Sequence, residues 1–183
     1  MPNHKRFMLA FAGAVTVFVA AHFLDFRGSV PDFVKTSGGG VLLDMKPEFT
    51  EAATYARLGG YGERGRANYA FRNVTVDILL PLGMLPFLLM FMDRALKRTS
   101  AGKATRAILL ALPIAYVVLD LAENGLVLAA LASFPVRVPL TVAVLPYVTI
   151  IKRAASLLSL FLPLVILGFV FARAQTRKVS GAH

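Results

Sequence analysis

Two carboxylates and an amide lie in the middle of an apolar run at residues 114–130, IAYVVLDLAENGLVLAA. The acids are Asp120 and Glu123, and Asn124 follows them directly. On a helix, spacings of three and four residues place these side chains on one face, together with Tyr116. A charge at the centre of a membrane helix costs roughly 2.5–3.5 kcal/mol on insertion scales, so these groups need partners or water. A carboxyl group in such surroundings is also a candidate general acid or base.

A second polar stripe occurs in the last apolar run, and it supplies the basic partners. The short connection SFPVRVP at residues 133–139 makes the two runs antiparallel neighbours. At about 1.5 Å per residue, Glu123 and Asp120 lie about 15 and 20 Å from the outer end of their helix, and Lys152 and Arg153 lie about 18–20 Å from theirs. Folding this hairpin about its midpoint places Arg153 beside Asp120 and Thr149 beside Asn124, to within one turn. The stripe consists of Thr149, Lys152, Ser156 and Ser159.

A third acid, Asp77, lies near the outer end of the preceding apolar run. Three acids then face two bases, which leaves one negative charge to be neutralised. If the chain is helical from about Arg64 into this run, Arg66 and Asp77 share a face. Both arginines would then reach the outer mouth of a pocket roofed by residues 61–69, although arginines here can also extend to lipid phosphates.

These residues support three functional hypotheses. The first is an enzyme or binding protein for an amphipathic, lipid-like or isoprenoid-type molecule that enters from the outer half of the bilayer. The second is a non-catalytic accessory or assembly subunit whose ion pairs stabilise the bundle. The third is a small proton-coupled transporter, which the absence of inverted repeats weakens unless a dimer supplies the symmetry. Under the first hypothesis, Asp120 and Glu123 are catalytic, and the substrate contacts are Asp77, Tyr116, Asn124, Lys152, Arg153, Arg64 and Arg66.

The composition identifies an integral membrane protein. Hydrophobic residues make up 57% of the 183 residues, charged residues only 16%, and the mean hydropathy is +0.67. Windows at residues 6–24, 75–91, 107–132 and 140–172 are long enough to cross a bilayer. The sequence therefore predicts one all-α domain over residues 1–183, a four-helix membrane bundle.

The outer loop at residues 25–74 is predicted to be partly helical. Residues 27–47 have little periodicity and contain Gly38-Gly39-Gly40, so we expect an irregular segment there. From Glu48 the pattern indicates a short amphipathic helix that ends at Gly59-Gly60. The first span also resembles the start of a secretory signal, with cleavage after Ala21 as the alternative to a retained helix.

Cysteine and histidine content restricts the chemistry further. The chain has no cysteine, which excludes disulfide exchange, thiolate metal sites and iron–sulfur clusters. Its three histidines, His4, His22 and His183, lie at chain ends or at a span end. A histidine-ligated haem or metal pair within the membrane is therefore not expected, and we expect neither a metal nor another cofactor. His22 and Asp25 are one turn apart and are expected to pair at the membrane surface.

The distribution of charge predicts the topology. Of the net charge of +10, the two tails and the loop at residues 93–106 carry +9, whereas residues 25–72 hold seven basic and six acidic residues. The positive-inside rule then places both termini in the cytoplasm, as expected in the inner membrane of a bacterial cell. Because the basic residues are explained by topology and anionic lipid, we expect membrane lipid and no nucleic acid as a partner, with a homodimer or larger membrane complex as an open possibility.

Reporter fusions test this topology. Reporters joined after residues 100 and 183 should give cytoplasmic signals, and one joined after residue 60 should give an extracytoplasmic signal. A cytoplasmic signal at residue 60 would contradict the predicted orientation.

Overall fold

The computed structural model describes the backbone of residues 2–180 and the side chains of residues 4–176. His183 and the side chains of Arg177 and Lys178 lie outside the described residues. Within them the chain forms seven helices and no strand. The helices are α1 (Pro2–Phe23), α2 (Val30–Thr36), α3 (Glu51–Gly60), α4 (Gly62–Val74), α5 (Val76–Leu96), α6 (Lys103–Ser133) and α7 (Pro139–Ser180).

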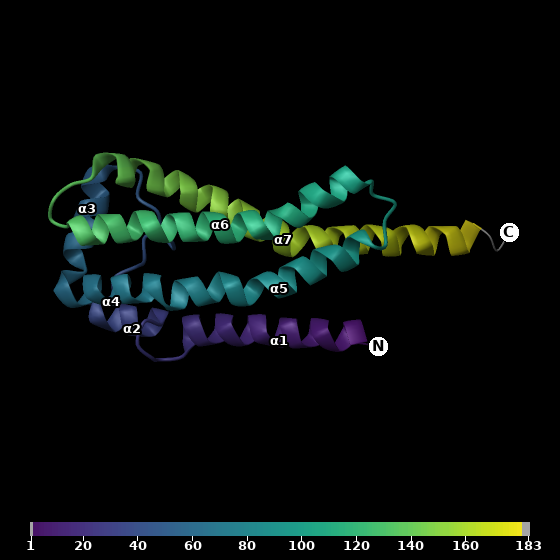
Figure 1. Cartoon of the computed structure of the whole chain (residues 1–183), viewed down its shortest axis with the longest axis horizontal. Helices are drawn as coiled ribbons and strands as arrows, with labels where there is room; N and C mark the ends of the chain where they lie inside the picture. The colour runs from purple at the N-terminus through teal and green to yellow at the C-terminus, as the bar shows by residue number, and fades with distance from the viewer. Residues whose placement is uncertain (1, 181–183) are drawn as a thin grey trace.

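Four long apolar segments form the bundle, which confirms the predicted all-α fold. They are α1, α4 together with α5, α6, and α7, and each is long and apolar enough to cross a membrane. Both termini and the connection between α5 and α6 lie at one end, which we call the inner end (Figure 1). The short helices α2, α3 and α4 lie at the opposite, outer end (Figure 1). This arrangement is the one that four crossings with both termini on one side require.

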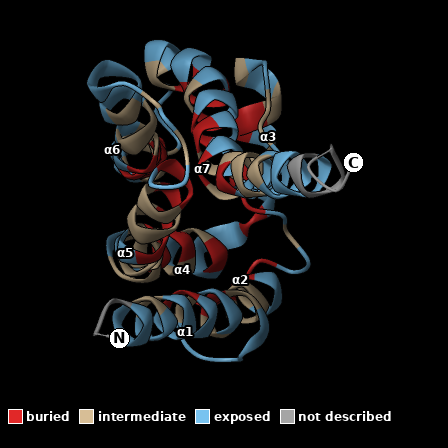
Figure 2. Ribbon diagram, turned by 90° about the vertical axis from the view of Figure 1, so that its right-hand side faces the viewer, coloured by how far each residue is buried: buried red, intermediate tan, exposed pale blue. Residues whose placement is uncertain are grey.

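The core of the bundle lies where α5, α6 and α7 face one another, whereas α1 is largely exposed (Figure 2). The α1 helix packs on α5 through small and aromatic side chains. Ala14 is buried, and the ring of Phe11 lies 5.3 Å from that of Phe87. A Cβ atom on Gly83 would lie 3.1 Å from Val17, so α1 and α5 approach closely there.

The chain is already helical before the predicted second span, but it does not enter that span as one continuous helix. The helices α4 and α5 are separated only by Thr75, whose backbone leaves helical geometry at φ −126° and ψ −84°. The Thr75 hydroxyl donates to the carbonyl of Phe71 at 2.7 Å. This break changes the face on which residues after Thr75 lie relative to those before it.

The expectation of an irregular segment at residues 27–47 is wrong for residues 30–36, which form α2. Ser29 caps this helix by accepting from the backbone of Asp32 at 3.3 Å, and Pro31 lies in its first turn, where it needs no hydrogen-bond acceptor. Beyond α2, Gly38 and Gly39 adopt positive φ and turn the chain. The predicted helix near Glu48 is confirmed as α3, although it begins at Glu51 behind the capping hydroxyl of Thr50.

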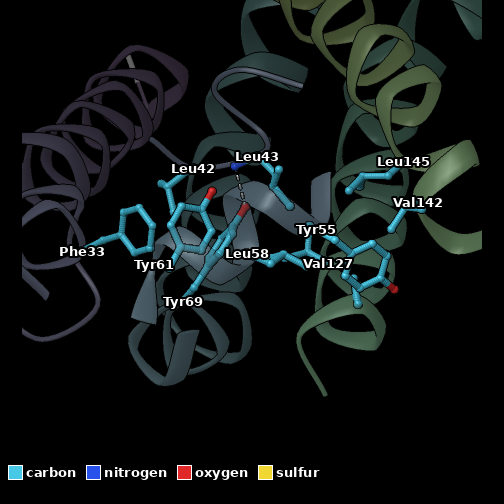
Figure 3. Packing of buried hydrophobic residues seen from close by; sticks show 11 residues of the cluster. Phe33, Leu42, Leu43, Tyr55, Leu58, Tyr61, Tyr69, Val127, Val142 and Leu145 are labelled. Atoms are coloured by element: carbon cyan, nitrogen blue, oxygen red, sulfur yellow. Dashed lines mark hydrogen bonds between the residues drawn. The ribbon is translucent and has the colours of Figure 1, made fainter. Parts of the chain in front are cut away.

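A buried cluster joins the outer helices to the outer ends of α6 and α7 (Figure 3). Tyr61 and Tyr69 lie at its centre, with the ring of Phe33 5.1 Å from that of Tyr61. Leu42 and Leu43 bring the irregular segment into this cluster (Figure 3). Helices α2, α3 and α4, with the loop between α2 and α3, therefore form an outer layer that has a buried core of its own. This core holds the loop in place over the bundle.

Replacing Gly65 by alanine should destabilise this layer. A Cβ atom there would lie 2.9 Å from the backbone of Ser37, which cannot move without displacing α2. We expect a loss of about 1–3 kcal/mol, visible as a lower thermal midpoint in detergent. Gly60→Ala is the matched control because its Cβ atom would meet nothing within 4 Å. Equal midpoints for the two variants would contradict this account of the α2–α4 contact.

Candidate functional site

A cavity of about 320 Å³ lies among the four long segments, near the outer end of α1. Its wall combines charged and polar groups with apolar side chains. Those groups come from α1, the loop after α2, and helices α4 to α7. The lining residues are Phe18, His22, Asp44, Arg72, Asp77, Leu80, Met84, Tyr116, Asp120, Asn124, Lys152, Arg153, Ser156 and Leu157.

Lys152 is the centre of the charged group. Its ammonium lies 3.2 Å from a carboxylate oxygen of Asp120 and also pairs with Glu123. Glu123 has no exposed surface, and it accepts a second hydrogen bond from the Thr149 hydroxyl. The prediction that both acids face the interior and approach Lys152 or Arg153 is confirmed. Glu123, however, lies behind Lys152 and does not line the cavity.

The observed pairing register of the hairpin differs from the predicted one by one position, which is within the predicted range of one turn. Lys152, not Arg153, contacts Asp120, and Thr149 bonds Glu123 rather than Asn124. Lys152 shares a face of α7 with Thr149, whereas Arg153 is turned about 100° away. Arg153 instead donates to the backbone carbonyls of Asp44 and Met45.

A second buried ion pair, between Arg72 and Asp77, was missed from the sequence. The two groups are 2.6 Å apart, and Arg72, which is 1% exposed, also donates to the Gly28 carbonyl at 2.9 Å. Asn124 donates to the backbone carbonyl of Asp77 at 3.2 Å, which links this pair to α6. The only available signal was the position of Arg72 in the last turn before the span. The expectation that Arg66 shares a face with Asp77 assumed one continuous helix, and the break at Thr75 shows that the helix is not continuous.

Arg64 and Arg66 do not reach the cavity. Arg66 donates to the carbonyl of Leu58 at 3.1 Å and lies over the ring of Phe134 at 4.2 Å, so it fastens α4 to α3 and to the α6–α7 connection. Arg64 is exposed beside a separate shallow surface pocket that Asp32 also lines. Neither arginine is among the residues that line the cavity.

The roof of the cavity is the loop around Asp44 rather than residues 61–69. Two tyrosines from that predicted segment hold this loop in place. The Tyr61 hydroxyl donates to the Val41 carbonyl at 2.6 Å, and Tyr69 accepts from the Leu43 amide at 3.1 Å. Burial raises the pKa of the Tyr61 phenol, so its hydroxyl stays protonated and remains a donor.

His22 lines the cavity, but it does not pair with Asp25 as expected. Asp25 pairs with Lys35 at the surface. The imidazole of His22 stacks on Phe18 with ring centroids 4.3 Å apart, and its Nδ1 lies 2.9 Å from the Phe18 carbonyl. The turn after Phe23 carries Asp25 away from α1.

The cavity lies one membrane thickness from the inner basic residues. Counting about 1.5 Å per residue gives about 24 Å from Arg6 to His22, about 27 Å from Arg106 to Asn124, and about 32 Å from Arg173 to Lys152. A hydrocarbon core is about 30 Å thick. The charged groups therefore lie at the outer boundary of the apolar layer. Depth counted in the sequence from the outer ends of α6 and α7 placed these groups deeper in the membrane. That count was too large because both helices continue beyond the cavity into the outer layer.

The charges around the cavity do not balance. Four carboxylates, those of Asp44, Asp77, Asp120 and Glu123, face three bases, Arg72, Lys152 and Arg153. Among the described residues, no basic group lies within ion-pair distance of Asp44, which accepts from the Tyr69 hydroxyl at 3.2 Å. The Arg72 Nε is buried without a hydrogen-bond partner. The one negative charge left over in the count from the sequence is neutralised by Arg72, which pairs with Asp77. Asp44, which that count did not include, is the carboxylate that lacks a pair.

No group of three His, Cys, Asp or Glu side chains in the described part of the chain is placed to hold a metal ion. Comparisons with protein-family models, curated proteins and solved structures give no match. The function must therefore be argued from the cavity itself.

Replacing Arg72 by methionine should strongly destabilise the protein. The change leaves the Asp77 carboxylate buried without its pair, which costs about 3–5 kcal/mol, or roughly 10 °C in the thermal midpoint. Lys35→Met removes an exposed base from its pair with Asp25 and should cost less than about 1 kcal/mol. Similar midpoints for the two variants would show that the Arg72–Asp77 pair is not required for folding.

Proposed function

We propose that this membrane protein binds an amphipathic, lipid-like small molecule whose polar head occupies the cavity. The observation that supports this most directly is that buried polar groups and exposed apolar side chains line the same cavity. Asp120, Asn124 and Lys152 are buried in its wall, whereas Phe18 and Leu157 are half exposed on α1 and α7. A head in the cavity would leave its apolar tail along these two helices, in contact with lipid.

The charges favour a head that carries hydrogen-bond donors, such as an amine or a hydroxyl group. Each base already has a partner, although the buried Nε of Arg72 has none: Arg72 is held by Asp77, Lys152 by two carboxylates, and Arg153 by backbone carbonyls. Asp44 and the second oxygen of Asp120 retain capacity to accept. Lys152, Arg153 and Arg66 were expected as substrate contacts, but their present partners leave them little capacity to hold an anionic head.

Asp120 is the candidate acid or base if the molecule is also transformed. It lines the cavity, and its contacts are long, 3.2 Å to Lys152 and 3.4 Å to Asn124. A carboxylate held this loosely can exchange a proton with a bound head. Glu123, which has no exposed surface, instead positions Lys152. Tyr116 and Asp77 line the cavity and would contact the sides of the head.

An accessory subunit of a larger membrane complex is the second candidate, and one observation favours it. The outer part of α7 exposes large apolar side chains, including Leu140 at 78% and Tyr147 at 61%. Exposed apolar surface beyond the level of the cavity is typical of a surface that another protein covers. Purification of a stable hetero-complex without any bound lipid would favour this candidate over the first.

Asp120→Asn should remove ligand binding and leave the fold intact. The amide keeps the shape, and Lys152 retains Glu123 as its partner. The probe is octadecylamine, and binding is measured by native mass spectrometry in a non-ionic detergent. The unmodified protein should bind one amine, and the variant should bind at least about tenfold less. A tenfold loss corresponds to one charge-assisted hydrogen bond.

Two controls separate binding from stability. Octadecyl phosphate, with the same chain and an anionic head, should bind more weakly than the amine to the unmodified protein. Glu123→Gln should lower the thermal midpoint more than Asp120→Asn does, because its buried partner Lys152 loses its closest carboxylate. Undiminished amine binding by Asp120→Asn, or a preference for the phosphate, would overturn the proposed head chemistry.

A further inference from the structure

We propose that a groove at the inner end of the bundle binds a phosphate-bearing anionic membrane lipid. The groove consists of two adjoining cavities of about 850 and 560 Å³, which share Arg98, Val170 and Ala174. It is bounded by the start of α1, the end of α5 and the inner half of α7. It lies about one membrane thickness from the outer cavity and is independent of the function proposed there.

One part of the groove wall is apolar and aromatic. Phe7 from α1, Phe91 from α5, and Leu167 and Phe171 from α7 face it. Gly168 leaves space between them, since a Cβ atom there would meet nothing within 4 Å. This surface suits a hydrocarbon chain and offers nothing to a small soluble anion.

The other part of the wall is strongly basic. Arg94, Lys97 and Arg98 come from the end of α5 and the turn after it, and Arg173 comes from α7. Lys97 is paired with Asp93 at 2.6 Å. Neither Arg98 nor Arg173 has a carboxylate of the described residues within ion-pair distance, so the groove carries uncompensated positive charge.

Aromatic rings hold two of the guanidinium groups at the groove. The Arg94 guanidinium lies 3.9 Å from the ring centroid of Phe7, and that of Arg173 lies 4.5 Å from that of Phe169. For Arg173, this stacking keeps the edge of the guanidinium available for donation to phosphate oxygens. Such stacking reduces the loss of side-chain freedom on binding.

The basic and apolar parts of the groove follow one another in the same order as the head group and the hydrocarbon chains of a membrane lipid. The bases lie at the ends of the helices, where head groups lie, and the apolar wall extends from them into the bilayer. Basic pockets between membrane helices on the cytoplasmic side bind anionic lipid heads in this way. Charge complementarity therefore identifies the head, and the apolar wall identifies the occupant as a lipid rather than free phosphate.

The test is lipid retention by the full chain. The protein is incorporated into nanodiscs of equal dioleoylphosphatidylglycerol and dioleoylphosphatidylcholine, extracted in mild detergent, and examined by native mass spectrometry. The phosphatidylglycerol should be retained in preference to the phosphatidylcholine. Arg98→Gln with Arg173→Gln should reduce this retention about fivefold for each basic side chain, or about thirtyfold for the pair. The double lysine variant at these positions should retain most of it.

A matched control removes the same charge elsewhere. Lys35→Gln with Arg137→Gln takes two exposed bases from the outer layer and should leave retention unchanged. An equal loss in this control would show general charge attraction and overturn the site, as would equal retention of the two lipids by the unmodified protein. Displacement of the lipid by millimolar inorganic phosphate would overturn the assignment of a lipid. If the glutamine pair fails to fold, the lipid preference of the unmodified protein decides the matter.

Discussion

The shared ammonium of Lys152 is the interaction on which the arrangement of α6 and α7 depends. One base is held by Asp120 and Glu123, two acids almost a turn apart, so neither helix can slide or rotate without leaving a charge unpaired. Such a group is costly to desolvate, and its value lies more in fixing register than in net stability. Thr149 adds a hydroxyl to Glu123 and completes the buried side of the group.

The outer layer depends on this register because it is attached to both partners of the hairpin. Arg153 fastens the loop at Asp44 to α7, and Asn124 fastens the start of α5 to α6. Arg72 then joins α4 and the turn at Gly28 to the same assembly through Asp77. The polar groups around the cavity are thus also the groups that hold its walls together. This dual use explains why only some of them remain free to contact a ligand.

The fold was predictable from the sequence in its main features, and the site only in part. Apolar length and basic flanks determine the four crossings, because few arrangements satisfy a 30 Å core. The stripe through Asp120 and Glu123 also follows from helical periodicity. The position of Arg153 did not follow from periodicity. On α7 a shift of one residue separates the buried Lys152 from the exposed Arg153. The pairing of Arg72 with Asp77 could not be predicted for a similar reason. The irregular backbone at Thr75 interrupts the helical periodicity that shows which residues share a face.

Because α6 and α7 continue past the cavity, the two sides of the bundle have unequal apolar lengths. The exposed apolar side chains of α1 run from Met8 to Phe23, about 23 Å. Those of α7 run from Leu140 to Phe171, about 47 Å, with Arg153 as the exposed charge beside the cavity. A bilayer of uniform thickness cannot match both. The mismatch must be relieved by tilting the bundle, by thickening the bilayer locally beside α7, or by covering that helix with another protein. A protein shaped in this way is sensitive to the thickness of the membrane in which it resides.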